Sequence, residues 1–261
     1  MGPYKARAIV LKSRDFQEAD RVVTLLSDRH GKIEAVARGA RRTRSQLGGA
    51  TQPFCLVTAS FYPGKTMDTM SQAEVTEGFR VLREDLELLA NASYLCELVD
   101  ESMGLRDATP GAYPLLLKAF GLLRDGHPPA TVRHMFQLRF LGILGIGPGL
   151  DRCLGCGREV LDPFFSPGQG GVLCHTCGSG QGAGRLSRQA LECMKALLRL
   201  EPGLSGRLVI DARTEREMCL ALDGYILWHL DKKLKSLSFL KQLGAREEQG
   251  DRCGRSTEEE R

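Results

Sequence analysis

The sequence contains few of the features that mark membrane proteins and secreted proteins. It has no run of 18 or more apolar residues, so we expect no membrane-spanning helix. Its first residues, MGPYKARAIVLKSRD, are interrupted by charges and lack the apolar stretch and the cleavage site of a signal peptide. We therefore expect a cytoplasmic protein with no membrane partner.

Several motifs of catalysis are also absent. There is no GxxxxGK[ST], GxGxxG or GxSxG pattern, so ATPase, dehydrogenase and α/β-hydrolase functions have no support. The sequence has no HExxH or HxE pattern and no clear acidic cluster of the nuclease type. We therefore expect a binding protein and not an enzyme.

The charge of the chain is small but unevenly distributed. The 261 residues carry a net charge of +4, and 42% of them are hydrophobic, which is enough for ordinary cores. Residues 1–65 hold twelve Lys or Arg and five Asp or Glu, a balance of +7, so the rest of the chain sums to −3. Basic charge concentrated in one segment is typical of a protein that binds a polyanion.

Residues 6–77 have the pattern of short β-strands. Five apolar runs rich in Val, Ile, Leu, Thr and Phe are separated by Gly, Asp, Pro or basic residues. In the fourth run Val57, Ala59 and Phe61 share one face by period two. Five strands without a long intervening helix favour a small barrel, although the pattern alone does not separate an OB-fold, an SH3-like barrel and a small sandwich.

From about Leu82 the apolar period changes to that of helices. Helices are predicted over residues 82–103, 113–123, 132–144 and 187–200. Thr214 followed by Glu217 is a capping-box pattern, and it predicts a long helix that extends to about Leu243. The fold class is thus α+β, with a barrel domain at 1–80, a helical domain in two parts at 81–150 and 186–245, an insertion at 151–185, and a polar tail at 246–261 that we expect to be disordered.

The insertion contains two CxxC pairs. Two cysteines on a tight turn direct both sulfurs to one point, and two such turns complete a tetrahedron that suits Zn²⁺. A glycine follows each pair, Gly157 and Gly178, where such turns often need a positive φ. The spacing predicts one structural zinc ion per chain, bound by Cys153, Cys156, Cys174 and Cys177.

Other interpretations of these cysteines are weaker. A thioredoxin-like redox pair needs a βαβ context, and two disulfides would be unusual in a reducing compartment. His175 could replace one cysteine as a ligand, but four cysteines already fill the shell, so we expect it to be exposed. Catalytic zinc keeps an open position, which four thiolates do not leave.

A basic loop follows the third predicted strand. Five residues of the thirteen from 32 to 44 are basic, and Glu34 is the one acid among them: Lys32, Arg38, Arg41, Arg42 and Arg44. Arginine binds phosphate through a planar fork of donors, and the glycines of this loop let a backbone approach closely. The segment predicts nucleic-acid binding, and the alternative is a solvated basic turn.

Other candidate contacts are less specific. Aromatic residues for base stacking are scarce, and Phe16, Phe54, Phe61 and Tyr62 are the candidates, of which we expect at least half to be core. Lysines 232, 233, 235 and 241 form either a solvated helix face or a second binding patch.

The order of these parts resembles a known family. The opening ARAIVLKSRDFQEADRVVTLLSDRHGKIEAVARGARR, the later SQAE and LREDLELLANASYLCELVDE, and the cysteine module CLGCG…CHTCG after GIGP are similar to RecO, a family of bacterial recombination mediators. The resemblance covers residues 5–243 or so, and GKIEAVARGARR with SQAE is its most specific part.

The resemblance implies an N-terminal OB-fold, a helical domain with an inserted zinc module, and no catalysis. It implies binding of single- and double-stranded DNA, annealing of complementary strands, and loading of RecA onto strands covered by single-strand-binding protein. The implied partners are RecR and the acidic C-terminal tail of the single-strand-binding protein, in the nucleoid of a bacterial cytoplasm. Lys32 and Arg38 match the family's basic motif, and Arg41, Arg42 and Arg44 adjoin it.

Two alternatives to a DNA-binding mediator remain. A basic barrel with a zinc ribbon also fits an RNA-binding protein of the translation apparatus, which would prefer A-form helices. A hydrolase acting on nucleic acid would cleave labelled strands in a metal-dependent way.

Overall fold

The computed structural model describes residues 2–180 and 182–243. The tail at 246–261, which the sequence predicts to be disordered, lies outside these residues. Among the described residues, no helix combines the length and the apolar character that crossing a membrane requires.

The N-terminal part is a closed five-stranded barrel, which confirms the predicted barrel and has the architecture of an OB-fold. The strands follow the order β1-β2-β3-β5-β4, and β3 and β5 are parallel, whereas the other neighbours are antiparallel. Their bounds are β1 (Tyr4–Phe16), β2 (Asp20–Ser27), β3 (Gly31–Ala37), β4 (Leu56–Tyr62) and β5 (Asp68–Glu77). A short helix, α1 (Leu47–Ala50), precedes β4.

Alternation along the strands fills the barrel interior. In β4 the side chains of Val57, Ala59 and Phe61 are buried, while Thr58 between them is exposed. The predicted inward face is therefore correct. With Val10, Leu25 and other residues of neighbouring strands, this face forms a core that is separate from the core of the helices.

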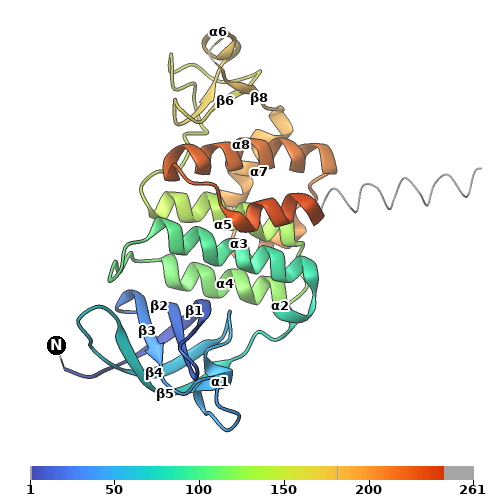
Figure 1. The fold of residues 1–261 in the computed structure, drawn as a ribbon. Coiled ribbons are helices and arrows are strands. Elements are labelled where there is room, and N and C mark those ends of the chain that lie inside the picture. Colours follow the sequence, from blue (N-terminus) through green and yellow to red (C-terminus); the bar gives the residue numbers. More distant parts are fainter. Residues whose placement is uncertain (1, 181, 244–261) are drawn as a thin grey trace, which may run out of the picture.

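A helical domain follows the barrel and lies above it in Figure 1. It contains α2 (Val81–Glu84), α3 (Leu86–Ser102), α4 (Ala112–Arg124), α5 (Pro129–Ile143), α7 (Arg188–Arg199) and α8 (Ala212–Leu230), and a 3₁₀ segment (Pro202–Arg207) precedes α8. Side chains cap the N-termini of α3 and α7: Asp85 accepts a hydrogen bond from the Leu88 amide, and Ser187 accepts one from the Ala190 amide.

The prediction for the last helix was wrong at both ends. The cap of α8 is Asp211, whose carboxylate accepts hydrogen bonds from the amides of Arg213 and Thr214. Glu217 accepts instead from the Ser187 amide, so it links α8 to α7. The helix ends at Leu230, because the next residue, Asp231, has φ 50°, and a second helical segment occupies 235–243. Because the apolar period continues across this break, periodicity alone did not reveal it.

One outer face of the barrel packs against the helical domain through aromatic rings. Phe120 of α4 lies edge-on to Phe54, with ring centroids 5.6 Å apart, and to Phe79, at 5.5 Å. Ile9 and Leu56 of the barrel belong to the same buried cluster. The apolar core of the helices therefore continues onto the barrel surface.

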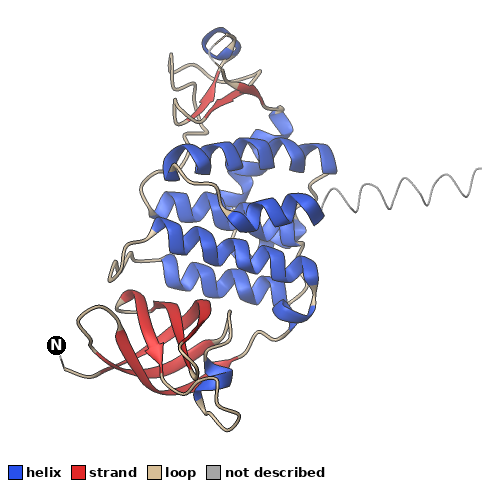
Figure 2. Cartoon of the chain, in the orientation of Figure 1, coloured by secondary structure: helices blue, strands red, loops and turns tan. Residues whose placement is uncertain are grey.

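The inserted module occupies the end of the helical domain opposite the barrel (Figure 1). It contains β6 (Phe164–Ser166), β7 (Gly171–Leu173), the short α6 (His175–Gly178) and β8 (Gly184–Arg185), with strand order β7-β6-β8. Figure 2 shows that loops make up much of the module and that helices dominate the middle of the molecule. The ring of Phe165 contacts Tyr225 of α8 at 5.7 Å between centroids.

The packing of Phe120 against Phe54 and Phe79, called here the aromatic seam, makes a testable contribution to stability. Phe120→Ala should lower the free energy of unfolding by about 3–5 kcal/mol, because it removes a fully buried ring from two edge contacts. Leu220→Ala, at a residue that is 73% exposed, should change it by less than about 0.5 kcal/mol. Denaturant titration of both variants measures the difference, and equal effects would contradict the role of the seam.

Candidate metal centre and nucleic-acid interface

The two CxxC pairs come together at one point of the inserted module. The sulfurs of Cys153, Cys156, Cys174 and Cys177 all lie within 4.8 Å of one another. The Sγ atoms of Cys156 and Cys174 are 3.7 Å apart. Tetrahedral Zn²⁺ with thiolates at about 2.3 Å requires sulfurs about 3.8 Å apart. The arrangement therefore fits a four-thiolate metal ion.

Backbone turns hold the sulfurs in place. The Cys174 amide donates to Cys153 Sγ at 3.2 Å, and the Gly157 amide donates to the Cys153 carbonyl at 2.8 Å. Gly157 has φ +74°, as predicted. The prediction was wrong for Gly178, which does not have a positive φ; it is small because a Cβ there would lie 2.5 Å from the Cβ of Phe164.

The charges around the sulfurs favour a bound cation. Arg158 donates to Cys156 Sγ at 3.4 Å, and this hydrogen bond lowers the pKa of Cys156 to about 6. Hydrogen bonding to the neighbouring sulfurs raises the pKa of Cys177 to about 12. Against the effect of its burial, backbone hydrogen bonds also lower the pKa of Cys153, and a divalent ion would compensate the negative charge of the four thiolates. His175 is exposed, as expected, and its ring lies 5.7 Å from that of Phe164.

Apolar residues of the module connect the cysteine cluster to the core of the helical domain. Phe164, Phe165, Val172 and Leu173 are buried and belong to the core of the helical domain. The sequence analysis did not single out these residues, because runs of two or three apolar positions are too short to show a period. The FF and VL pairs flanking the glycine-rich GQGG turn are the signal that could have indicated a small hairpin.

At the other end of the molecule, the basic loop follows β3. Asp20 accepts a hydrogen bond from the Gly39 amide at 2.7 Å, and Ala40 and Leu47 are buried, so the loop is anchored to the barrel. The side chains of Arg38, Arg42 and Arg44 are exposed. These three guanidinium groups make no ion pair with the described residues, so they are available to an external anion.

The other two predicted residues have partners. Arg41 donates to the carbonyls of Gln17 and Glu18 at 3.2 and 3.1 Å and pairs with Asp15 at 3.4 Å, so it braces the β1–β2 turn. Lys32 is 11% exposed at its side chain, and its ammonium lies 3.1 Å from the Asp100 carboxylate of α3. The structure therefore brings Arg38, Arg41, Arg42 and Arg44 together in one loop and places Lys32 at the junction between the domains.

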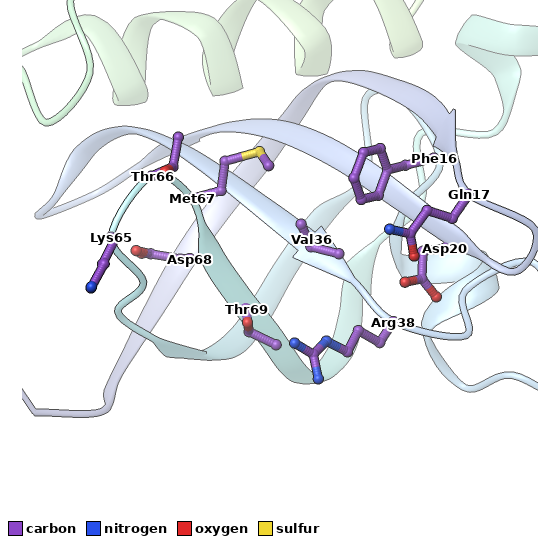
Figure 3. A pocket seen from close by; sticks show the side chains of 10 residues that line it. All are labelled: Phe16, Gln17, Asp20, Val36, Arg38, Lys65, Thr66, Met67, Asp68 and Thr69. Carbon is purple, nitrogen blue, oxygen red and sulfur yellow. The ribbon is translucent and has the colours of Figure 1, made fainter.

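A hollow of about 530 Å³ adjoins the loop on the barrel surface (Figure 3). The hollow is lined by Val36 of β3 and Arg38 just after it, by Phe16 at the end of β1 and Gln17 after it, and by Asp20 at the start of β2. Residues 65–69, which run from the β4–β5 loop into β5, line its other side. Figure 3 shows Arg38 and Lys65 on different sides of the hollow and the Phe16 ring along its upper part. OB-folds bind oligonucleotides on the face of their second and third strands, between the loops β1–β2 and β4–β5, and residues of both regions line this hollow.

Some residues that line this hollow were not predicted from the sequence. The sequence analysis did not select Lys65, Thr66 or Thr69, although the YPGK turn between the fourth and fifth strands could have suggested the lysine. Among the aromatic candidates, Phe54 and Phe61 are core residues, Phe16 is half-buried in the hollow, and Tyr62 is 54% exposed elsewhere on the barrel. The expectation that at least half are core is correct.

A polar cluster surrounds the buried carboxylate of Asp68, the first residue of β5. Asp68 accepts hydrogen bonds from the Tyr4 hydroxyl and from the guanidinium of Arg106, which comes from the loop after α3. Burial, followed by the hydrogen bond to Asp68, raises the pKa of Tyr4 to about 12. Tyr4 is therefore a neutral donor at physiological pH.

The lysines near the C-terminal end of the described chain have mixed environments. Lys232 pairs with Glu101 at 2.8 Å, and Lys241 pairs with Asp223 at 3.2 Å. Lys233 and Lys235 are exposed. Half of this set is thus engaged with acidic residues of the same molecule, which favours the solvated face over a second binding patch.

Comparison with known proteins gives consistent matches along the chain. Residues 1–79 match the family described as Recombination protein O N terminal, and residues 83–238 match Recombination protein O C terminal. The chain is similar to the DNA repair protein RecO of Symbiobacterium thermophilum, with 42% identity over 249 residues, 93% of this chain and 98% of the relative.

Two further relatives carry the same description. RecO of Desulforamulus reducens is 36% identical over 243 residues, which span 92% of this chain and 94% of the relative. RecO of Bacillus pumilus is 31% identical over 240 residues, with the same two coverages. The chain therefore belongs to the RecO family of DNA repair proteins.

Proposed function

We propose that this chain is a recombination mediator that binds single- and double-stranded DNA at the barrel and acts without a catalytic step. The hollow beside the basic loop is the observation that supports the proposal. It lies on the face that OB-folds use for oligonucleotides, and arginines that make no ion pair with the described residues lie in or next to it. Family membership supports a role in DNA repair and recombination.

The chemistry of the hollow suits a nucleic-acid strand. Arg38 and Lys65 approach it from two sides, and Arg42 and Arg44 extend the positive surface along the loop. The two carboxylates of the hollow are engaged internally: Asp20 with the Gly39 amide and Asp68 with Arg106. Repulsion of phosphates is therefore weakened, and the half-buried Phe16 offers an apolar contact to a base.

Annealing follows from charge neutralisation. Base pairing is downhill once the repulsion between two backbones is screened, and a basic surface that binds phosphates of both strands supplies that screening. This step needs no nucleotide hydrolysis, in keeping with the sequence, which has no phosphate-binding loop.

The wider role is proposed from the family. With RecR, the chain would help to load RecA onto single strands covered by single-strand-binding protein, whose acidic C-terminal tail it would contact. This activity would take place in the cytoplasm of a bacterium, at the nucleoid. The four cysteines would bind one Zn²⁺ with a structural role, since four thiolates leave no open coordination position.

Loss of the free arginines tests the DNA site. Arg38→Ala with Arg42→Ala should weaken binding of single strands of any sequence about equally, because phosphates carry no base identity. The slope of log K against log salt should become shallower by about 0.7 for each lost contact. Fluorescence anisotropy at several salt concentrations measures both quantities.

A matched control removes two exposed arginines elsewhere. Arg185→Ala with Arg213→Ala takes away the same charge at residues whose side chains are 76% and 86% exposed, far from the barrel, and should leave the slope unchanged. Equal behaviour of the two double variants would move the DNA site away from the hollow. Tighter binding of A-form RNA in competition would instead favour the RNA-binding alternative.

Strand annealing is expected to proceed without ATP. Purified protein should accelerate pairing of complementary oligonucleotides equally in the presence and absence of ATP, as followed by quenching of paired dyes. A strict requirement for ATP, or cleavage of the labelled strands, would show that the protein has a catalytic function.

The zinc prediction has its own measurement. Elemental analysis of undamaged protein should give one zinc per chain, and Cys153→Ser with Cys174→Ser should abolish it. Hydrogen exchange should then rise first in residues 151–180, because the barrel has a separate core. Cys193→Ser, at a buried thiol of α7, should retain the metal. Full metal content in the double variant would exclude this site.

A further inference from the structure

The segment that follows α3 in the helical domain contacts both β3 of the barrel and Asp68, one of the residues that line the proposed DNA hollow. The segment after α3 adds a parallel bridge to β3, between Lys32 and Leu105, and the Arg106 amide donates to the Lys32 carbonyl at 2.8 Å. The ammonium of Lys32 in turn binds the carbonyl and the carboxylate of Asp100. This segment is therefore attached to the barrel by its backbone as well as by side chains.

Arg106 extends from this segment to the β4–β5 loop. Its guanidinium donates to Asp68 and, at 2.7 Å, to the Tyr4 hydroxyl, and its Cζ lies 5.4 Å from the centre of the Tyr4 ring. Arg106 has φ 64°, a left-handed conformation that is unfavourable for a residue with a side chain and persists only where surrounding contacts impose it. The bond of the Arg106 amide to Lys32 and the bonds of its guanidinium to Asp68 and Tyr4 are the contacts that hold this conformation.

Asp68 transmits the contact to the hollow. Its carboxylate is 4% exposed and accepts from the Gly64 amide at 3.5 Å, so one charged group ties Arg106, Tyr4 and the turn of the loop together. Asp68 itself and its neighbours Lys65 and Thr69 line the hollow. A buried carboxylate needs its cationic partner, since an unpaired charge at this depth is strongly unfavourable.

We propose that Arg106 is a positioning residue for DNA binding: by pairing with Asp68 it holds the β4–β5 loop, and with it Lys65, in the arrangement that receives the phosphate backbone. Arg106 lines neither the hollow nor the basic loop. Its effect on DNA therefore passes through the loop, and the helical domain controls part of the barrel's binding surface. This inference rests on the proposed function of the hollow.

The test compares Arg106 with a matched arginine. The side chain of Arg106 is 43% exposed; that of Arg124 is 44% exposed, pairs with Glu77 and lies 5.9 Å from the Phe79 ring, away from both the hollow and the basic loop. Arg106→Gln should weaken single-strand binding about tenfold, equivalent to about 1.4 kcal/mol, whereas Arg124→Gln should not. Hydrogen exchange in residues 63–68 of the free protein should rise only in the Arg106 variant.

A double-mutant cycle separates positioning from direct contact. If Arg106 acts through the loop, Arg106→Gln should cost less than about twofold in a Lys65→Ala background, because the group that it positions is already absent. Arg106→Lys should bind DNA as poorly as Arg106→Gln, since an ammonium lacks the fork that bonds Tyr4 and Asp68 together. Multiplicative losses in the cycle, or full binding by Arg106→Lys, would overturn the proposal in favour of a direct phosphate contact.

Two controls keep the outcome interpretable. If Arg106→Gln alone does not fold, the double variant Asp68→Asn with Arg106→Gln removes the unpaired carboxylate, and it should melt near the wild type yet bind DNA weakly; full DNA affinity in a folded double variant would overturn the proposal. If Arg38→Ala with Arg42→Ala loses DNA binding and Arg106→Gln does not, the proposal fails and the DNA site stands. If Arg38→Ala with Arg42→Ala does not change DNA binding, the proposed function of the hollow is wrong, and the role of Arg106 falls with it.

Discussion

A continuous apolar core, from one outer face of the barrel through the helices to the cysteine-bearing module, is the constraint on which the rest of the structure depends. Phe54 and Leu56 belong to it at one end, Phe120 in the middle, and Phe165 and Leu173 at the other end. Because the barrel also has an interior core of its own, the shared core uses only one side of it. The basic loop and the hollow lie on surface that this packing leaves open.

The sequence was sufficient to predict those parts of the fold in which a single period governs burial. Strand β4 alternates inward and outward residues, and buried residues in α4 and α7 recur with the helical period, so the barrel and these helices could be predicted. The four cysteines could be predicted too, since the CxxC spacing encodes the turn. The end of α8 could not, because the apolar period continues through Asp231, where only the backbone changes.

The functional surface was predicted less completely, for a different reason. A run of basic residues in the sequence gives their charge but does not show where each side chain points. Arg38 lines the hollow, Arg41 bonds to the β1–β2 turn, and Lys32 pairs with Asp100 of the helical domain. Lys65 stands alone in the sequence, 27 positions after Arg38, and joins the hollow only through barrel closure. Pairing partners far apart in the chain decide such roles, and one sequence does not reveal them.

The placement of the cysteine module has a consequence for how freely its length can change. The module is the part of the chain between α5 and α7. These two helices also contact each other directly: Arg139 of α5, for example, donates to the Leu197 carbonyl at 3.1 Å. Extra residues in the module's exposed loops cost little, since doubling a flexible loop adds only about 0.6 kcal/mol of closure entropy. The helical domain would therefore tolerate longer exposed loops in the module but not the loss of Phe165 and Leu173, which belong to the shared core. A change in the length of the β4–β5 loop would instead alter the barrel surface itself.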